Sequence, residues 1–318
     1  MITATDLTSM KTSEHPFSES RFVPYRAVRT VGRGPVLVLA PHPDDEVFGC
    51  GGAIMRHLEA GDPVRVVIAT DGALGVGPDQ PDPIRTRQNE TRRAADLLGH
   101  QDPQFWSWPD RGLEYGETLI DQILEAIADW AAELVYAPSW WEIHPDHLTL
   151  ALASAEAVRR CSRPLQLAFY EVGSPLWPNR LLDITDLAER KRAAMACFAS
   201  QMAQQDYDRH VAALNSFRTY TLSSEVRAVE AFRLLNGEEL RTPPWDAMRP
   251  SPETTLAALA ESLRLPRPSE RSAEDEETAA RIRALTEEIE ALERSTSWRL
   301  TAPLRWLVTR LRGIGRRS

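Results

Sequence analysis

The chain has 318 residues but only three cysteines, and their placement builds no obvious site. Cys50, Cys161 and Cys197 are widely spaced and form no CxxC pair. An odd number of cysteines at this spacing argues against a disulfide framework and against a zinc site made of cysteines. Such sparse use of cysteine fits a reducing compartment, so we expect a cytoplasmic protein.

Long apolar runs and an excess of positive charge are absent as well. No stretch of about 18 apolar residues occurs, so the sequence predicts no transmembrane helix. The N-terminus is polar and lacks the hydrophobic core of a signal peptide. The formal net charge of −9 argues against general nucleic-acid binding. With 42% hydrophobic residues, the chain is expected to form a globular protein with a sizeable core.

From residue 34 onward, apolar β-forming runs alternate with amphipathic helical patterns. Strands are expected at 36–40, 64–70, 134–137 and 165–172, and helices at 54–60, 85–98, 120–132, 148–160 and 187–205. This alternation implies parallel pairing and right-handed crossovers. The predicted fold class is therefore α/β, a Rossmann-like three-layer sandwich with a mostly parallel sheet, followed by a C-terminal helical tail.

Two clusters of ionisable side chains follow two of the expected strands. The first is HPDDE at 42–46, after the strand 36–40, and the second is EIHPDH at 142–147, after the strand 134–137. Like charges this close repel, and their burial is costly unless a cation is present. Because ligands of such sheets sit beyond the carboxyl ends of the strands, we expect the two clusters to meet at one edge.

The residue types in these clusters indicate metal-assisted hydrolysis of an amide. Two histidines and one carboxylate, with a fourth position open for water, are a common zinc set. Zinc lowers the pKa of its water to about 7, and a second carboxylate beside the ligand can act as general base. A remaining histidine can stabilise an oxyanion or protonate a leaving amine. Taken singly, each of these residues also has an ordinary structural explanation, because HPD sequences favour turns.

The same motifs resemble a known family. APHPDDE at 40–46 is similar to the (A)HPDDE signature of the PIG-L/LmbE-like N-acetylglucosaminyl deacetylases, and HPDH at 144–147 is similar to their second motif. Further segments match in the expected order: RQNE at 87–90, WPDRGL at 108–113, LDITD at 182–186, Lys191, and Ser200-Gln201. The resemblance runs from about residue 34 to residue 205.

The resemblance implies a role for each matching residue. It implies that His42, Asp45 and His147 bind zinc, and the same ligands can also bind Fe²⁺. It implies that Asp44 is the general base. It implies that His144 assists at the oxyanion or at the leaving group.

The resemblance also implies two substrate contacts. Arg87 and Asp110 match positions that contact the sugar, although both also have structural explanations. The chain departs from some sugar deacetylases of the family at Glu142, where they carry a tyrosine, and Glu142 is a candidate to orient His144. Four tryptophans are expected near the site, either to stack on a sugar or to pack as ordinary core residues: Trp106, Trp108, Trp140 and Trp141.

Composition divides the chain into four parts: an N-terminal extension (1–33), a deacetylase domain (34–242), a proline-rich linker (243–273) and a helical tail (274–318). Apolar residues at 282, 285, 289 and 292 follow a coiled-coil spacing, but over only about two heptads, so a solvated amphipathic helix is an equal alternative. The oligomeric state stays open.

The last segment, 295–318, contains six arginines and no acidic residue. A basic amphipathic helix here suits the surface of an anionic membrane, a partner, or the protein itself. Residues 295–305 resemble a terminal motif of enzymes of bacterial surface-polysaccharide assembly. The resemblance implies a peripheral position at the inner face of the membrane or a glycan-assembly partner.

The sequence thus predicts a zinc-dependent hydrolase that removes the N-acetyl group of an amino sugar, in a glycan, glycolipid or nucleotide-sugar precursor, by attack of zinc-bound water. One alternative is an amide hydrolase of the same fold that acts on an acylated natural product. Another is a non-catalytic scaffold in glycan assembly.

Overall fold

The computed structural model of the chain describes residues 23–76, 81–241 and Arg281. One compact unit spans Ser18–Arg249. All helices and strands named below belong to Ser18–Arg249. The predicted linker at 243–273 and the predicted helical tail at 274–318 lie outside the described residues, apart from Arg281.

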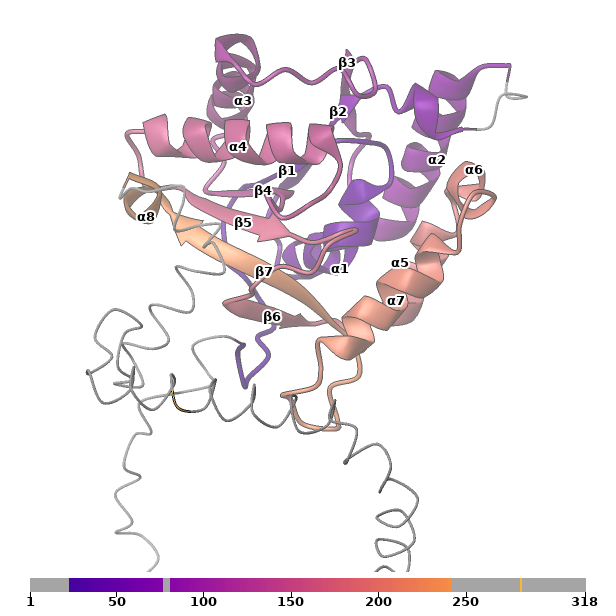
Figure 1. Cartoon of the computed structure of the whole chain (residues 1–318), viewed down its shortest axis with the longest axis vertical. Coiled ribbons are helices and arrows are strands. Elements are labelled where there is room, and N and C mark those ends of the chain that lie inside the picture. The colour runs from indigo at the N-terminus through magenta and orange to yellow at the C-terminus, as the bar shows by residue number, and fades with distance from the viewer. Residues whose placement is uncertain (1–22, 77–80, 242–280, 282–318) are drawn as a thin grey trace, which may run out of the picture. The chain divides into compact units, whose positions relative to one another are not determined.

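A seven-stranded sheet forms the middle of the unit, with its strands in the order β3-β2-β1-β4-β5-β7-β6 (Figure 1). The strands are β1 (Val36–Ala40), β2 (Val64–Thr70), β3 (Gln104–Trp108), β4 (Leu134–Pro138), β5 (Gln166–Tyr170), β6 (Arg180–Asp183) and β7 (Val229–Asn236). The strands β1 to β5 pair in parallel, whereas β7 runs antiparallel to both of its neighbours. The α/β fold with a mostly parallel sheet is therefore confirmed.

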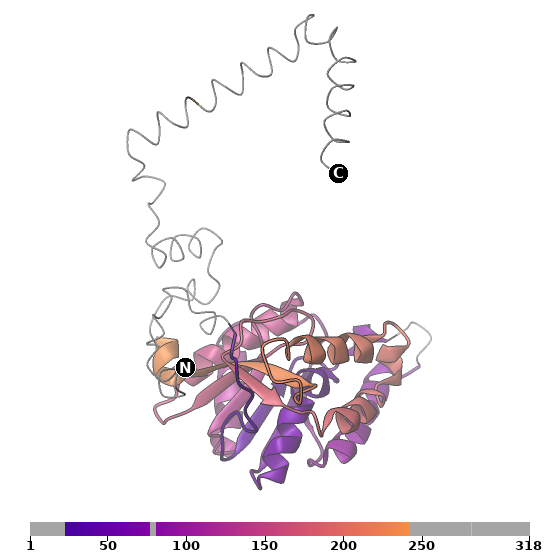
Figure 2. The same ribbon diagram turned by 90° about the horizontal axis from the view of Figure 1, so that it is seen from below.

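Two layers of helices cover the sheet, as the two views in Figures 1 and 2 show. One face packs against α3 (Glu117–Asp129) and α4 (Pro145–Arg160). The other face packs against α1 (Asp45–Glu59), α2 (Pro83–Leu98), α5 (Ala188–Met195) and α7 (Tyr207–Phe217). Two short helices, α6 (Ala199–Met202) and α8 (Gly237–Arg241), contact α2 and α4 respectively. Among the described helices, none combines the length and the apolar character needed to cross a membrane.

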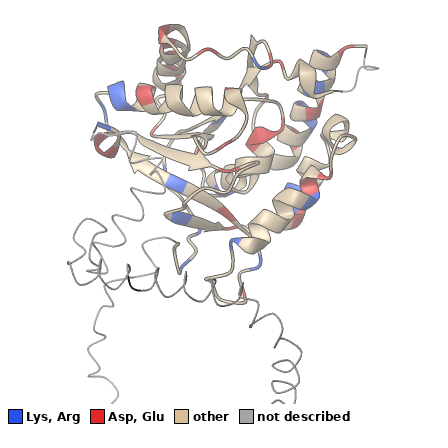
Figure 3. Ribbon diagram, in the orientation of Figure 1, with Lys and Arg blue, Asp and Glu red and all other residues tan. Residues whose placement is uncertain are grey.

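The strand β1 shows why the sequence folds into three layers. Val36, Val38 and Ala40 point into the core beneath α1 and α2, whereas Leu37 and Leu39 point into the core beneath α3 and α4. All of β1 is at most 1% exposed. A continuous apolar run is what a strand needs when both of its faces are buried. In Figure 3 the central strands are accordingly almost free of charged residues, which lie mainly on the helices and loops.

Several predicted elements differ from the structure, and the differences have local causes. The helix expected at 54–60 begins at Asp45, and the helix expected at 187–205 breaks after Met195 and resumes at Ala199. The strands β3, β6 and β7 and the helices α7 and α8 were not predicted. The strand β3 is a partly exposed edge strand, and charged residues interrupt the apolar pattern of β7 at Glu230 and Arg233.

A buried ion pair supports α1 at an internal break. The backbone of Cys50 is not helical, with φ −142° and ψ 24°. The Glu230 carboxylate accepts hydrogen bonds from the Gly52 and Ala53 amides, at 2.7 and 2.8 Å, and so caps the second half of the helix. The Lys191 ammonium lies 2.7 Å from the same carboxylate, and both side chains are at most 2% exposed. This pair holds α1, and hence the loop before it, in place.

Glycine in the first half of α1 allows close packing on the sheet. A Cβ atom at Gly49 would lie 2.2 Å from Cδ2 of Tyr170. The Tyr170 ring has no room to retreat, because it is fully buried and its hydroxyl donates to the Leu39 carbonyl at 3.0 Å. At Gly51, by contrast, the nearest atom to such a Cβ would lie at 3.6 Å, which is an ordinary contact.

We predict that Gly49→Ala lowers the free energy of unfolding by about 1–3 kcal/mol, the usual cost of overpacking a core. Gly51→Ala is the matched control and should change it by less than about 1 kcal/mol, because alanine favours the helix and its Cβ would make only ordinary van der Waals contacts. Urea unfolding followed by circular dichroism measures both. Equal stability of the two variants would contradict the packing described for Gly49.

Candidate metal centre and active site

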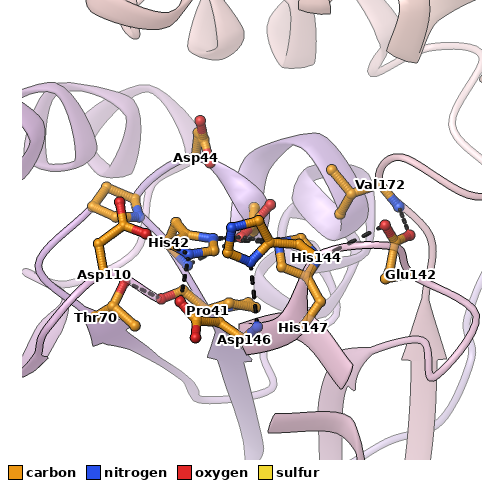
Figure 4. A network of polar contacts seen from close by, with 12 residues as sticks. Pro41, His42, Asp44, Thr70, Asp110, Glu142, His144, Asp146, His147 and Val172 are labelled. Atoms are coloured by element: carbon orange, nitrogen blue, oxygen red, sulfur yellow. Dashed lines mark hydrogen bonds and ion pairs between the residues drawn. The ribbon is translucent and has the colours of Figure 1, made fainter. Parts of the chain in front are cut away.

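The structure brings the two predicted clusters together at one edge of the sheet. Residues 41–44 connect β1 to α1, and residues 139–144 connect β4 to α4. The strands β1 and β4 are parallel neighbours, with Val36 paired to Leu134, so both loops leave the sheet at carboxyl ends. Figure 4 shows His42, His144 and His147 gathered at this edge.

Three potential ligand atoms form a small triangle. Nδ1 of His42 lies 3.2 Å from Oδ2 of Asp45 and 3.3 Å from Nε2 of His147, and the last two atoms are 3.1 Å apart. Around a tetrahedral zinc ion, with bonds near 2.1 Å, neighbouring ligand atoms are about 3.3–3.5 Å apart. The donor types and their spacing therefore fit a divalent metal such as zinc.

For both Asp45 and His42, burial shifts the pKa in one direction and the neighbouring side chains shift it in the other. Burial alone would raise the pKa of Asp45, but the charges and hydrogen bonds of His147 and His42 lower it below its usual range. Burial would lower the pKa of His42, yet Asp110, Asp146 and Asp45 together raise it well above its ordinary value. The Asp45 carboxylate is thus held in the ionised form that a metal ligand requires.

Two further carboxylates, which are also potential metal ligands, lie near the other ring nitrogen of His42. Nε2 of His42 lies 3.0 Å from Oδ2 of Asp146 and 3.5 Å from Oδ1 of Asp110. Potential ligand atoms of His42, Asp110, His144 and Asp146 all lie within 4.8 Å of one another, as do those of His42, His144 and His147. We favour the triangle with Asp45, because its Oδ2 lies within 3.2 Å of nitrogens of both His42 and His147. Asp110 and Asp146 lie within ion-pair distance of His42 alone among the imidazoles, as carboxylates that orient a metal-bound histidine do.

Asp146 is a site residue that the sequence reasoning missed. Its Oδ2 accepts from the Arg111 amide at 2.7 Å as well as contacting His42, and its Oδ1 accepts from the Leu113 amide at 3.2 Å. The side chain is 1% exposed. Asp146 therefore fixes the ring of His42 and ties the loop after β3 to the metal centre. Its place inside the HPDH motif was the available signal.

Asp44 lies beside the triangle and is not part of it. Its Oδ2 is 3.2 Å from NH2 of Arg87, and in Figure 4 the side chain stands to one side of the imidazoles. Burial raises the pKa of Asp44 to about 7, with Arg87 opposing the rise and the charge of Asp45 adding to it. The residue has φ 121°, a conformation that is rare outside glycine and that often marks functional sites.

Glu46 lies in the first turn of α1, where the helix dipole favours an acid. One of its oxygens accepts from the Asp44 amide at 3.0 Å, and the other, Oε1, is buried without a hydrogen-bond partner. Burial, and then the charge of Asp44, raises the pKa of Glu46 to about 8. Glu46 therefore holds the backbone of the loop, and it is not among the residues that line the pocket described below.

Two of the further segments that match the family, RQNE at 87–90 and Ser200-Gln201, contact each other beside the pocket. Glu90 accepts from the Ser200 amide at 2.8 Å and from its hydroxyl at 2.6 Å. Gln201 donates to the Gly75 carbonyl, and Arg87 donates to the Pro43 carbonyl. The helix α2 is thereby joined both to the loop at residues 41–44 and to α6.

Glu142 holds the wall of the pocket instead of orienting His144. Its carboxylate accepts from the amides of Val172, Gly173 and Ser174 at distances from 2.7 to 3.2 Å. The nearest imidazole nitrogen recorded for it is Nδ1 of His147, at 3.7 Å. The expected link to His144 is therefore wrong, because the three amides of the 172–174 loop occupy the carboxylate.

His144 caps the N-terminus of α4 and stays partly exposed. Its Nδ1 accepts from the Asp146 amide at 3.3 Å, and its ring stands edge-on to that of His42 with centroids 4.5 Å apart. Burial and the charges of His42 and His147 lower the pKa of His144. A neutral imidazole beside the ligands can act as a hydrogen-bond donor or a proton carrier.

A pocket of about 360 Å³ opens over this centre. All of the site residues predicted from the sequence line it: His42, Asp44, Asp45, Arg87, Asp110, His144 and His147. Asp110 accepts from the Leu74 amide at 3.0 Å, and burial and His42 act in opposite directions on its pKa, which ends below the usual range. Phe48 and Tyr207 supply aromatic lining that the sequence reasoning did not identify.

The tryptophans expected near the site pack elsewhere. Trp140 is buried against Phe169 in the core beneath α3 and α4, with ring centroids 4.5 Å apart. Trp106, Trp108 and Trp141 pack against the same core. Among the described residues that line the pocket there is no tryptophan, so the structural alternative given for them is the correct one.

Comparison with known proteins agrees with this arrangement. Residues 37–158 match the profile of the family described as PIG-L, GlcNAc-PI de-N-acetylase. The chain carries a PIG-L family domain. The matched range includes both loops of the metal centre, Arg87 and Asp110.

Relatives of this PIG-L domain include two deacetylases. The probable N-acetyl-alpha-D-glucosaminyl L-malate deacetylase 2 of Bacillus anthracis is 29% identical over 190 residues, which cover 53% of this chain and 81% of that protein. The diacetylchitobiose deacetylase of Thermococcus kodakarensis is 27% identical over 195 residues, 54% of this chain and 72% of that protein.

A solved structure of the N,N'-diacetylchitobiose deacetylase from Pyrococcus horikoshii is also similar. It has a TM-score of 0.60 and 25% sequence identity, and the match covers 67% of this chain and 88% of that chain. The similarity thus extends over most of the described unit.

We predict that Asp146→Asn weakens zinc binding by about 10–100-fold, the usual cost of losing a carboxylate that orients a metal-bound histidine. Competition with a fluorescent chelator measures the affinity. Asp121→Asn, on the exposed face of α3, is the matched control and should bind zinc like the wild type. Unchanged affinity in Asp146→Asn would show that Asp146 does not position His42.

Proposed function

We propose that this protein is a metal-dependent deacetylase that hydrolyses the N-acetyl group of an amino sugar to a free amine and acetate. The observation that carries the proposal is the triangle of His42, Asp45 and His147, with a separate buried acid, Asp44, beside it in the same pocket. The PIG-L domain and the N-acetylglucosaminyl deacetylases among its relatives support the choice of substrate class.

The proposed ligands are Nδ1 of His42, Oδ2 of Asp45 and Nε2 of His147. A metal ion held there, zinc or Fe²⁺, would supply a Lewis acid for the acetyl carbonyl and a water molecule whose pKa is lowered towards about 7. Asp146 keeps His42 in the required orientation, since it accepts at Nε2 and leaves Nδ1 free to bind.

The chain's own groups account for the proton transfers. Asp44 accepts a proton from the attacking water as the oxygen adds to the carbonyl carbon, and Arg87 fixes the Asp44 carboxylate during this step. His144 donates a hydrogen bond through Nε2 to the oxyanion or to the leaving nitrogen, since its Nδ1 accepts from the Asp146 amide. Asp44 returns its proton to the sugar nitrogen as the carbon–nitrogen bond breaks, so that the amine leaves without a negative charge. Acetate keeps the oxygen of the water.

The remaining predicted residues are proposed to hold the sugar. Arg87 is 2% exposed, and its Nε and NH1 groups have no hydrogen-bond partner within the described part of the chain. Unpaired buried donors that line a pocket are costly unless a ligand accepts from them. Asp110 lines the same pocket and retains lone pairs for a sugar hydroxyl.

We predict that Asp44→Asn retains zinc but loses about 10²–10⁴-fold in kcat, the usual contribution of a general base. Asparagine keeps an oxygen for Arg87 and tolerates positive φ, so the fold should survive. Release of acetate from methyl N-acetylglucosaminide, with metal analysis of the same samples, tests this.

Asp96→Asn, on the exposed face of α2, serves as the control and should behave as the wild type. If Asp44→Asn turned over near the wild-type rate, Asp44 would not be the base. If the wild-type protein with metal released no acetate from any N-acetyl sugar, the deacetylase function itself would be wrong.

A further inference from the structure

Arg111 lies at the pocket in an unusual backbone conformation. It follows Asp110 in the loop after β3 and has φ 62°, a left-handed value that residues other than glycine and asparagine rarely adopt. Its amide donates to Asp146 at 2.7 Å, and this bond fixes the turn. Of the four described non-glycine residues with positive φ, two, Asp44 and Arg111, line the pocket.

The acids that line the pocket already have partners. Asp44 faces Arg87, and Asp45 faces the two histidines of the triangle. Asp110 accepts from the Leu74 amide, and Glu142 accepts from three amides of the opposite wall. None of these carboxylates within the described pocket lies within ion-pair distance of the Arg111 guanidinium.

The arginines, by contrast, have hydrogen-bonding capacity to spare. Arg111 is exposed, and its guanidinium has no recorded hydrogen bond or ion pair to the described residues. Arg87 carries two unpaired N–H groups although it is buried. An arginine that lies at a pocket in a strained turn, with no partner among the described residues, is available to bind a group outside the chain.

The position of Arg111 relative to the histidines limits where its ligand can be. Arg111 and His144 line the same pocket, and the Arg111 amide donates to Asp146, whose carboxylate lies 3.0 Å from Nε2 of His42. Arg111 therefore belongs to the same cavity as the histidine proposed to assist at the leaving nitrogen. A group bound by Arg111 would belong to the reacting sugar or to the unit attached directly to it.

We propose that Arg111 is a specificity-determining residue that binds an anionic group, a phosphate or a carboxylate, carried by the amino-sugar substrate. The proposal rests on the deacetylase function above and narrows its substrate class to acidic sugars. A guanidinium binds either group through two parallel hydrogen bonds, which sets orientation as well as affinity.

The test compares three sugars on the full-length, zinc-loaded protein. Methyl N-acetylglucosaminide is neutral, N-acetylglucosamine 1-phosphate carries a phosphate, and N-acetylmuramic acid carries a carboxylate. Calorimetry measures binding, and acetate release is followed in parallel. The variants are Arg111→Asn, which suits a left-handed turn but has no charge, and Arg111→Lys, which keeps the charge without the paired donors.

We expect wild type to bind at least one acidic sugar about tenfold or more tightly than the neutral one, since a charged hydrogen bond is worth about that factor. Arg111→Asn should remove the preference, and Arg111→Lys should keep part of it. Arg192→Gln, an exposed arginine on α5 paired with Glu189, is the control and should keep the whole preference. Which acid is preferred distinguishes phosphate from carboxylate.

Two results would overturn the proposal: a wild type without preference for either acid, or a preference that persists in Arg111→Asn. In either case acetate release from the neutral sugar would leave the deacetylase function standing. Conversely, binding of an acidic sugar that depends on Arg111, with no acetate released from any sugar, would support the anion site and refute the deacetylase function.

Discussion

The pairing of β1 with β4 is the constraint on which the rest of the site depends. The two strands are parallel neighbours, so the loops after Ala40 and after Pro138 leave the sheet at the same edge. Residues that are about a hundred positions apart in the chain thereby come within 3.3 Å of each other, as Nδ1 of His42 and Nε2 of His147 do. Without this pairing, neither loop alone holds a complete set of ligands.

Burial of several carboxylates destabilises the site, and groups of the chain offset only part of this effect. Asp44, Asp45 and Glu46 are buried side by side, and burial raises the pKa of Asp44 to about 7 and that of Glu46 to about 8. Arg87 and backbone amides offset part of this cost. Among the described residues, no lysine or arginine forms an ion pair with the Asp45 carboxylate of the triangle, and a divalent ion is the group whose charge and size suit it.

Much of this arrangement follows from the sequence, and what does not has physical reasons. The strand β1 was predictable because a strand buried on both faces reads as a continuous apolar run. The strand β7 was not, because Glu230 is a buried charge whose partners, Lys191 and the amides of α1, come from distant parts of the chain. The periodicity of apolar residues along the chain indicates which positions are buried locally. It contains no information about contacts between distant parts of the chain.

The proposed metal ligands were also predictable, because local sequence indicates them. His42, Asp45 and His147 belong to compact motifs at strand ends, so their types and spacing indicate a metal. Asp146 was overlooked because the sequence of HPDH does not show which of its residues orients the His42 ring; only the folded structure does. Glu142 was misassigned, since the amides of Val172, Gly173 and Ser174 come from a wall that no local pattern reveals.

The account's central claim is the position of the metal, and anomalous diffraction at the zinc edge tests it most directly. In crystals grown with zinc, the account predicts one strong peak at about 2.0–2.2 Å from Nδ1 of His42, Oδ2 of Asp45 and Nε2 of His147. A peak instead on the far side of His42, between Nε2 and the carboxylates of Asp110 and Asp146, or no peak at this edge of the sheet, would contradict it.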